Sequence, residues 1–356
     1  MSFARPPRVV LSLGMAALLG SLAVPARAVT IDWVTVGDPG NPNDTINTGT
    51  TPNYGAVADS FQIMKFEFTN QQYTDFLNSV DPNGTNPNSV YSESGQGGTT
   101  RGGITNTGTT NGSRYAVKPD MGDKPVNYVN WFDAARVSNW LMNGATGTSS
   151  METGAYTLNN ATSGNAPAVN PGATFYIPTE NQWYKAAYYK GGSTNAGYWT
   201  YATQSDAVPT AVTAGLTGSG SSGSTGNYAN YGRAAGWNGQ NGNVTTVGTN
   251  GGASAYGAFD MSGNVNEWND LTGAAGSTRG TRGGSWWDNN VSDLSSPIRS
   301  SINPSSEFVY YGLRLASPVP VPEPATSCMA LAGLACGCWM LRRQKPAGGP
   351  RRSSLS

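Results

Sequence analysis

The residues Tyr256-Gly-Ala-Phe-Asp-Met-Ser-Gly-Asn-Val-Asn-Glu-Trp268 form the stretch of this chain that says most about its fold. A Gly-Asn pair at 263–264 interrupts an aromatic and apolar segment, and both residue types favour tight turns because they tolerate positive φ angles. Trp268 ends the stretch with the largest apolar side chain that a protein can offer to a core. We therefore predict a polar turn that Trp268 anchors to the core.

Three helices are predicted outside this turn, each from a start signal in the sequence. They cover residues 69–80, residues 131–142, and a segment that begins at 178–182 and stops at the glycines 191–192. Thr69 is a predicted N-cap of the first helix. Thr179 and Gln182 have the spacing of a capping box at the start of the third helix. Short apolar and aromatic clusters predict strands at 61–68, 156–158, 175–177, 282–286 and 311–315.

The rest of the sequence consists of long loops rich in Gly, Asn, Ser and Thr, at 37–56, 81–124, 143–173 and 191–256. The chain nevertheless contains 10 Trp, 17 Tyr and 9 Phe, which supply large surfaces to bury. We therefore predict one α+β domain over residues 29–318, with short strands, few helices, long irregular loops and an aromatic core.

Charge and the rarest residue types exclude several function classes. The chain has 21 basic and 21 acidic residues and no long basic run, so nucleic acid is not an expected partner. It contains no His, and its three cysteines, Cys328, Cys336 and Cys338, all lie in an apolar C-terminal segment. There they are interpreted as small apolar residues of a membrane helix, with lipidation or metal binding as the alternatives. Residues 29–318 hold no thiol or imidazole for chemistry.

Residues 1–28 have the pattern of a secretory signal peptide. Arg5 and Arg8 precede an apolar run, and Ala26-Arg27-Ala28 supplies a small-residue cleavage site. An uncleaved membrane anchor is the alternative, although the run is short for a bilayer span. The pattern predicts export across the inner membrane.

The C-terminus has three parts in the order of a sorting signal. A linker at 319–324 ends in Val-Pro-Glu-Pro, an apolar segment at 325–341 is long enough to span a bilayer, and 342–356 is a basic tail. Basic residues beside a span stay on the cytoplasmic side. This order resembles the PEP-CTERM signal of Gram-negative bacteria. The resemblance implies an exosortase as a partner of the tail, transient anchoring in the membrane, and a final place on the cell surface or in the extracellular matrix.

Six segments between residues 57 and 316 resemble one family when they are taken in order. They include Ile-Pro-Thr-Glu-Asn-Gln-Trp at 177–183, Arg-Gly-Gly-Ser-Trp at 282–286 and Gly-Leu-Arg-Leu-Ala at 312–316, together with 61–73, 124–135 and 256–268. The family is the formylglycine-generating, sulfatase-modifying factor type. The resemblance implies a mixed α/β, C-type-lectin-like fold with much irregular structure.

Active members of that family oxidise a sulfatase cysteine with copper held by two cysteines of their own, and a related branch uses iron held by histidines. Residues 29–318 contain neither residue type. Because thiolate is the ligand that suits Cu(I), we expect neither copper nor iron, and no formylglycine generation.

The resemblance also implies a calcium site, since family members bind calcium at the turn around the Gly-Asn pair. The matching residues are Asn264, Val265 and Glu267, and Ca²⁺ prefers oxygen ligands. The alternative is a purely structural turn. A second family calcium site is not expected, because residues 247–250 contain no acidic side chain.

Aromatic side chains suit carbohydrate and peptide recognition because they are rigid and amphipathic. The candidates for a ligand-binding surface are Trp286, Trp287, Arg282 and Tyr231. The alternative is that most rings belong to the core, and that Arg282, Arg314 and Glu180 are buried charges that satisfy one another.

Three functional hypotheses follow. We expect an exported, non-catalytic binding or structural protein of the surface or matrix, with exopolysaccharide or a surface protein as its partner. The second hypothesis is an enzyme of uncharacterised chemistry that uses carboxylates such as Asp133, Asp260, Glu267 or Asp288. Paired carboxylates with shifted pKa values in a cleft would support it. The third is a partner that holds a sulfatase-like substrate without modifying it.

Overall fold

The computed structural model describes residues 1, 29–46, 53–109 and 113–318. The predicted signal peptide 1–28, the linker 319–324, the apolar segment 325–341 with its three cysteines, and the tail 342–356 lie outside these residues, Met1 excepted. Within the described ranges, no helix combines the length and the apolar character needed to cross a bilayer.

All three predicted α-helices are present, and the two for which a cap was predicted begin with that cap. They are α1 (Asn70–Val80), α2 (Trp131–Met142) and α3 (Glu180–Tyr188). Thr69 and Thr179 each form a full capping box, in which the cap side chain and the side chain three residues later exchange hydrogen bonds with the backbone. Helix α3 ends at Tyr188, three residues before the predicted glycine stop. Three one-turn helices, at Pro87–Ser89, Glu93–Gly97 and Val291–Leu294, were not expected.

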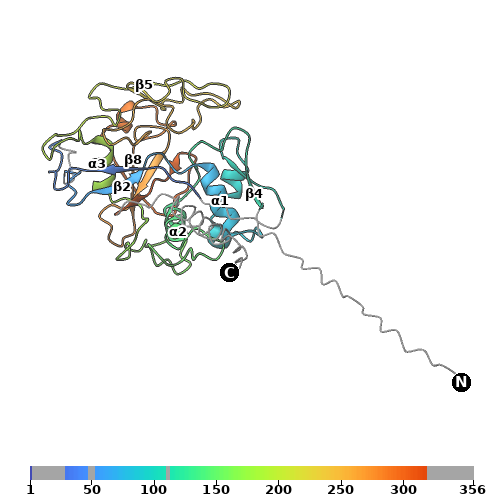
Figure 1. Ribbon diagram of the computed structural model, residues 1–356. Coiled ribbons are helices and arrows are strands. Elements are labelled where there is room, and N and C mark those ends of the chain that lie inside the picture. Colours follow the sequence, from blue (N-terminus) through green and yellow to red (C-terminus); the bar gives the residue numbers. More distant parts are fainter. Residues whose placement is uncertain (2–28, 47–52, 110–112, 319–356) are drawn as a thin grey trace, which may run out of the picture.

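Short strands form two central sheets. The first has the order β1 (Trp33–Val36), β2 (Phe61–Met64), β11 (Ala316–Ser317) and is antiparallel. The second has the order β10 (Tyr311–Gly312), β7 (Asn266–Asn269), β8 (Arg279–Arg282), β9 (Ser300–Ile302), and only its β10–β7 pair is parallel. In Figure 1 these strands lie between α3 on one side and α1 on the other. Two small pairs complete the set: β3 (Ile104–Asn106) with β4 (Tyr115–Val117), and β5 (Thr210–Ala211) with β6 (Tyr228–Ala229).

The strand predictions were less accurate than the helix predictions. Residues 156–158 form no strand, and within 175–177 only Tyr176 makes a single bridge, to Ala316. The strand expected at 282–286 instead ends at Arg282. It stops there because Gly283 and Gly284 take φ angles of 94° and 67°, which lie outside the range of a strand.

The core is aromatic, as the composition predicts. Its largest fully buried side chains include Trp131, Trp140, Trp183, Trp268 and Trp286. Trp268 packs in the main core and donates a hydrogen bond of 3.0 Å from Nε1 to the Val129 carbonyl, so the predicted anchor of the 256–268 turn is confirmed. Buried indole N–H groups need such partners.

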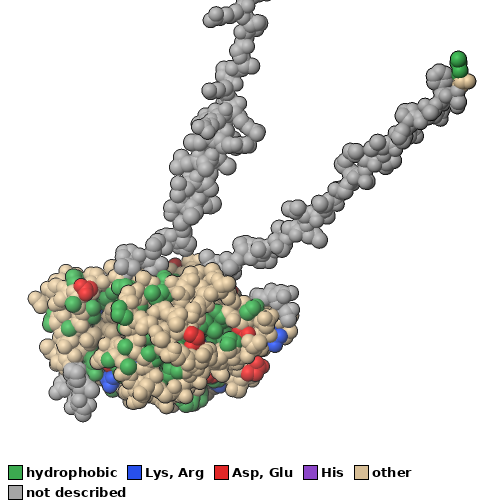
Figure 2. Space-filling model, turned by 90° about the horizontal axis from the view of Figure 1, so that it is seen from below, with side chains coloured by type: hydrophobic (Ala, Val, Ile, Leu, Met, Phe, Trp, Pro, Cys, Tyr) green, Lys and Arg blue, Asp and Glu red, His purple; other side chains and the backbone are tan. Residues whose placement is uncertain are grey.

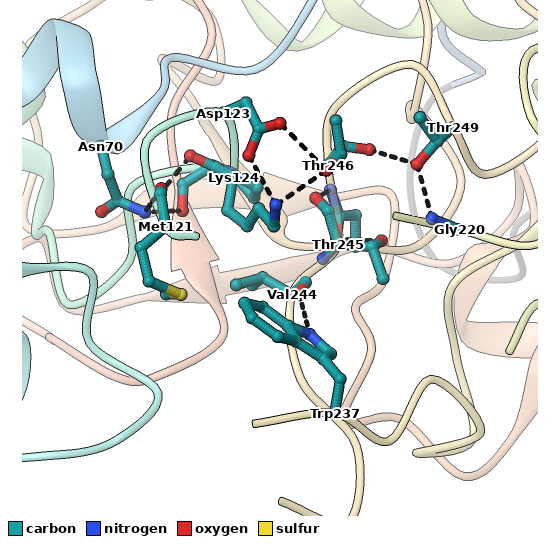
Figure 3. A network of polar contacts seen from close by, with 12 residues as sticks. Asn70, Met121, Asp123, Lys124, Gly220, Trp237, Val244, Thr245, Thr246 and Thr249 are labelled. Carbon is teal, nitrogen blue, oxygen red and sulfur yellow. Dashed lines mark hydrogen bonds and ion pairs between the residues drawn. The ribbon is translucent and has the colours of Figure 1, made fainter. Parts of the chain in front are cut away.

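Polar contacts hold two of the long loops against each other. Figure 3 shows Lys124, which is buried, with its ammonium group between the carboxylate of Asp123 and the hydroxyl of Thr246. Thr246 also donates to Asp123, and the ring of Trp237 lies 5.2 Å from the ammonium nitrogen. Residues 121–124 and 237–249 are therefore joined by side chains as well as by the backbone.

The surface carries few charges. Only 12% of the chain is charged, and Figure 2 shows one face on which uncharged polar surface separates a small number of acidic and basic side chains. Binding of a ligand through charged side chains is therefore confined to the few places where charged residues lie beside aromatic rings.

Candidate functional site

The turn predicted from the sequence is a closed polar network. Gly263 and Asn264 both have positive φ angles, and a Cβ atom on Gly263 would lie 2.4 Å from the Asn230 carbonyl oxygen. The Asn264 Oδ1 atom accepts from the Asn230 amide at 3.1 Å and from the Thr245 N–H at 2.9 Å. Its Nδ2 group donates to Glu67 at 2.7 Å. Every polar atom of the Asn264 side chain is therefore used inside the protein.

Glu267 is held by a buried guanidinium. Arg314 donates from Nη2 to Oε1 at 2.8 Å and from Nε to Oε2 at 2.9 Å, a forked pairing that suits arginine. The Trp183 indole N–H donates to the same Oε2 atom at 2.7 Å. All three side chains are fully buried.

The buried charges around this pair are unequal. Glu67, Asp260 and Glu267 supply three carboxylates, and Arg314 is the cation that faces them. Burial raises the pKa of Glu67 well above its ordinary value, and the charges of Asp260 and Glu267 raise it further. Burial likewise raises the pKa of Asp260. Both carboxyls therefore bind a proton more readily than they would in water, and a bound proton lowers the negative charge of the core.

The side chains predicted as calcium ligands contact protein donors in this structure. The side-chain oxygens of Asn264 and Glu267 already accept hydrogen bonds, and the Val265 N–H donates to Glu67 at 3.2 Å. Among the described residues, no group of three or more acidic side chains is arranged to hold a metal ion. Calcium at this turn would have to displace protein donors, so it stays a prediction that no contact supports.

A second buried ion pair joins α3 to the segment 296–300. Glu180 is the first residue of α3, and it accepts from Arg282 Nε at 2.8 Å and from Arg299 at 2.7 and 2.9 Å. Arg282 also donates to the carbonyls of Ser296 and Ile298. The pairing of Glu180 with Arg282 is the arrangement that the alternative interpretation predicted. Arg314 is not part of it, because its partner is Glu267.

A cavity of about 300 Å³ lies at the second sheet, beside the segments 287–300 and 310–311. Two carboxylates, one amide and three aromatic rings contribute to its wall: Asp288, Asp293, Asn266, Trp287, Tyr310 and Tyr311. The guanidinium groups of Arg282 and Arg299 form another part of the wall, although both are paired with Glu180. The cavity is therefore polar, ringed by aromatics and open to a ligand.

The two carboxylates of the cavity have different partners. Asp288 Oδ2 accepts from the Ser285 N–H at 2.8 Å, from the Ser285 hydroxyl at 2.9 Å and from the Asn266 amide at 3.4 Å. Burial raises the pKa of Asp293, and the charge of Asp288 raises it further. The charge of Asp288 therefore acts on Asp293.

An aromatic platform continues from the cavity to the surface. The ring centres of Trp287 and Tyr310 are 6.5 Å apart, and Phe308 stacks on Tyr310 with ring centres 5.4 Å apart and planes 5° apart. Phe308 is 48% exposed, which is unusual for such a large apolar side chain.

The structure brings together only part of the predicted ligand surface. Trp287 and Arg282 both line the cavity. The surface position predicted for Trp286 is wrong, because that residue is fully buried and packs with Met121 and Trp237. Tyr231 is half-buried and donates its hydroxyl to the Pro209 carbonyl, away from the cavity.

Sequence reasoning missed Asp293, Tyr310 and Arg299 as members of this site. The feature of the sequence that could have indicated these residues is their position. They lie in the polar stretch between the Arg-Gly-Gly-Ser-Trp and Gly-Leu-Arg-Leu-Ala segments. Loops that leave neighbouring strands commonly carry the functional residues of a domain.

These features define a loop-rich α+β domain of the formylglycine-generating, C-type-lectin-like type. The chain belongs to the family of the sulfatase-modifying factor enzyme 1-like domain, which it matches over residues 26–319. The resemblance of residues 57–316 to this family and the fold class inferred from the sequence are thereby confirmed. No match was found among curated proteins.

Solved structures with a similar fold include three proteins. Treponema denticola variable protein 1 is 20% identical, with 81% of this chain and 95% of that chain covered and a TM-score of 0.43. CarF is 21% identical, with 82% and 99% covered and a TM-score of 0.46. PvdO from Pseudomonas aeruginosa is 17% identical, with 81% and 92% covered and a TM-score of 0.41. At these identities the likeness concerns the fold alone.

Proposed function

We propose that this chain is an exported binding protein of the cell surface or matrix, and that its cavity beside Trp287 binds a carbohydrate without modifying it. One observation carries the proposal: the cavity combines aromatic rings with the carboxylates Asp288 and Asp293 and the amide of Asn266. Aromatic faces bind the apolar faces of sugar rings, and carboxylates and amides accept and donate hydrogen bonds to hydroxyl groups.

The contacts of Asp288 suit this role. Its Oδ2 atom is fixed by Ser285 and Asn266, whereas no contact among the described residues engages Oδ1. An oriented carboxylate with one oxygen available accepts a hydroxyl hydrogen bond at little cost in side-chain entropy. The half-buried ring of Trp287 supplies the neighbouring apolar surface.

The location is part of the same proposal. Residues 1–28 would direct export, 29–318 would form the exported domain, and 319–324 with 325–341 and the tail 342–356 would form a sorting signal for an exosortase. At the cell surface or in the matrix the proposed ligand is exopolysaccharide, and a surface protein is the alternative partner. The support for this part is the sequence pattern of the two ends.

An enzyme is the second candidate, because two carboxylates, Asp288 and Asp293, line the same cavity. The raised pKa of Asp293 beside Asp288 is a pattern found in acid–base pairs. The other carboxylates considered for catalysis, Asp133, Asp260 and Glu267, are buried and do not line this cavity. No specific contact favours a sulfatase-binding role.

The test is a glycan array probed with residues 29–318, which contain every described helix and strand, followed by calorimetry on the best ligand. Saturable binding should be lost in Trp287→Ala and in Asp288→Asn. It should persist in the matched control Trp199→Ala, because Trp199 lies against Lys190 and does not line the cavity. Equal loss in all three variants would contradict the proposed site. Bond cleavage in the bound glycan that stops in Asp288→Asn and in Asp293→Asn would favour the enzyme.

A further inference from the structure

Two arginines lie against the tryptophan pair at the edge of the cavity. The guanidinium carbon of Arg233 is 3.7 Å from the ring centre of Trp287. That of Arg101 is 5.0 Å from the ring centre of Trp286 and 5.9 Å from that of Trp287. The two cations are close enough that the charge of Arg233, after the larger effect of burial, helps to lower the pKa of Arg101.

Chain segments far apart in the sequence hold these arginines in place. The Gly242 carbonyl accepts from Arg101 Nε at 3.1 Å, and a Cβ atom on Gly242 would lie 2.6 Å from the Cβ atom of Arg233. The Arg233 N–H donates to the Trp286 carbonyl at 2.9 Å, and Arg233 itself has a φ angle of 57°. A non-glycine residue with such a φ angle is uncommon, and the close approach of Gly242 shows that this backbone is fixed by packing.

The charges of this pair are not neutralised by the protein. Neither arginine forms an ion pair within the described residues, and Arg233 Nε is buried without a hydrogen-bond acceptor. The fully buried arginines, in contrast, all have a carboxylate partner: Arg136, Arg279, Arg282 and Arg314. Acidic groups are not scarce, because residues 29–318 contain 13 basic and 20 acidic side chains.

Two adjacent guanidinium groups without a counter-ion repel each other and favour an anion between them. A guanidinium pairs with a carboxylate or sulfate through parallel hydrogen bonds, which fix the orientation of the anion in addition to the attraction between the charges. Because Trp287 contacts both arginines and also lines the cavity, the two arginines lie next to the ring that a ligand in the cavity would contact.

We propose that Arg101 and Arg233 form an anion subsite that selects acidic sugars, with a carboxylate or sulfate group on the ring that occupies the cavity. This inference rests on the proposed carbohydrate-binding function and narrows its ligand class. In this proposal the two aspartates of the cavity contact hydroxyl groups of the sugar, and the two arginines beside Trp287 contact the anion.

The test uses the full chain in detergent and oligosaccharides that differ only at C6, which carries a hydroxyl, a carboxylate or a sulfate. Calorimetry at low and moderate salt should show at least tenfold tighter binding of an acidic form, with a preference that weakens as salt increases. Arg233→Gln and Arg101→Gln should reduce the affinity for the acidic ligand to that for the neutral one. Arg114→Gln is the matched control, because Arg114 also lacks an ion pair within the described residues and contacts neither tryptophan.

The outcomes separate this inference from the function on which it rests. Equal affinity for the neutral and acidic ligands overturns the anion subsite and leaves the carbohydrate site intact. Acidic selectivity that survives both substitutions overturns the assignment to these two arginines. Absence of binding to every oligosaccharide contradicts the proposed function and the subsite with it. Arg233→Lys keeps the positive charge but lacks the parallel N–H donors of the guanidinium. An intermediate affinity of this variant for the acidic ligand therefore supports the subsite, even where Arg233→Gln fails to fold.

Discussion

Replacing Arg314 with Met should destabilise the domain by about 3–5 kcal/mol, the usual cost of removing one partner of a buried ion pair. The substitution leaves the Glu267 carboxylate buried beside Glu67 and Asp260 without a cation. It also removes hydrogen bonds of 2.7 and 2.6 Å to the carbonyls of Met64 and Phe259. Each of these is worth about 1.5 kcal/mol or more, because the donor is charged.

Urea unfolding followed by tryptophan fluorescence measures this loss, since Trp183 lies against the pair. For a domain of this size the expected loss corresponds to a fall in Tm of about 5–8 °C. Arg114→Met is the control. Its side chain donates a hydrogen bond of 3.4 Å to the exposed Thr109 carbonyl, so we expect a change within about 0.5 kcal/mol.

The double variant Arg314→Met with Glu267→Gln tests the cause. The amide oxygen introduced by Glu267→Gln would still accept from the Trp183 indole but would carry no charge, so the double variant should recover at least about 1 kcal/mol relative to Arg314→Met alone. A loss below about 1 kcal/mol in Arg314→Met, or no recovery in the double variant, would refute the argument that an uncompensated buried carboxylate is the main cost.

Burial raises the pKa of Asp133 from 3.8 to about 8, so the folded state binds more protons than the unfolded state between these values. Stability should therefore fall as pH rises from 4 to 8, by up to about 1.4 kcal/mol per pH unit from this group, and Asp133→Asn should flatten the profile of unfolding free energy against pH. Thr179→Ala removes the cap of α3 and should cost about 1 kcal/mol in urea unfolding, whereas Thr179→Ser should cost far less. Gly263→Ala places a Cβ atom 2.4 Å from the Asn230 oxygen at a φ angle of 91°, and its Tm should fall by an amount equivalent to more than about 2 kcal/mol. Because the oxygens of the 264–267 turn accept protein donors, EDTA should leave Tm unchanged; a rise in Tm with added calcium would contradict this and support the calcium site.

The helices could be predicted because their start signals are local. Thr69 and Gln72, like Thr179 and Gln182, lie three residues apart, and the hydrogen bonds between them depend on little else. Strand β7 was missed because Asn266–Asn269 has only four residues, and Trp268 is the one apolar residue among them, so no alternating pattern marks it. Such a short segment becomes a strand only when neighbouring strands supply its hydrogen bonds.

The candidate site could be predicted only in part, because burial is a property of the assembled domain. Trp286 and Trp287 are adjacent and chemically identical, yet the first is in the core and the second lines the cavity. Tyr231 and Tyr310 are the same residue type and both lie in irregular segments, but only Tyr310 lines the cavity. No local pattern distinguishes the members of either pair.

The sequence by itself determined the family, the three capped helices, the aromatic core and the lack of Cys and His in residues 29–318. These properties depend on residue type and on spacings of a few positions, which the chain carries before it folds. The tertiary structure alone decided that Glu267 pairs with Arg314, that Asp288 and Asp293 share a cavity with Tyr310, and that Arg101 and Arg233 both lie against Trp287. These contacts join segments up to 132 positions apart, as between Arg101 and Arg233. Because short-range propensities carry no information about such distant pairs, only the packed domain could bring them together.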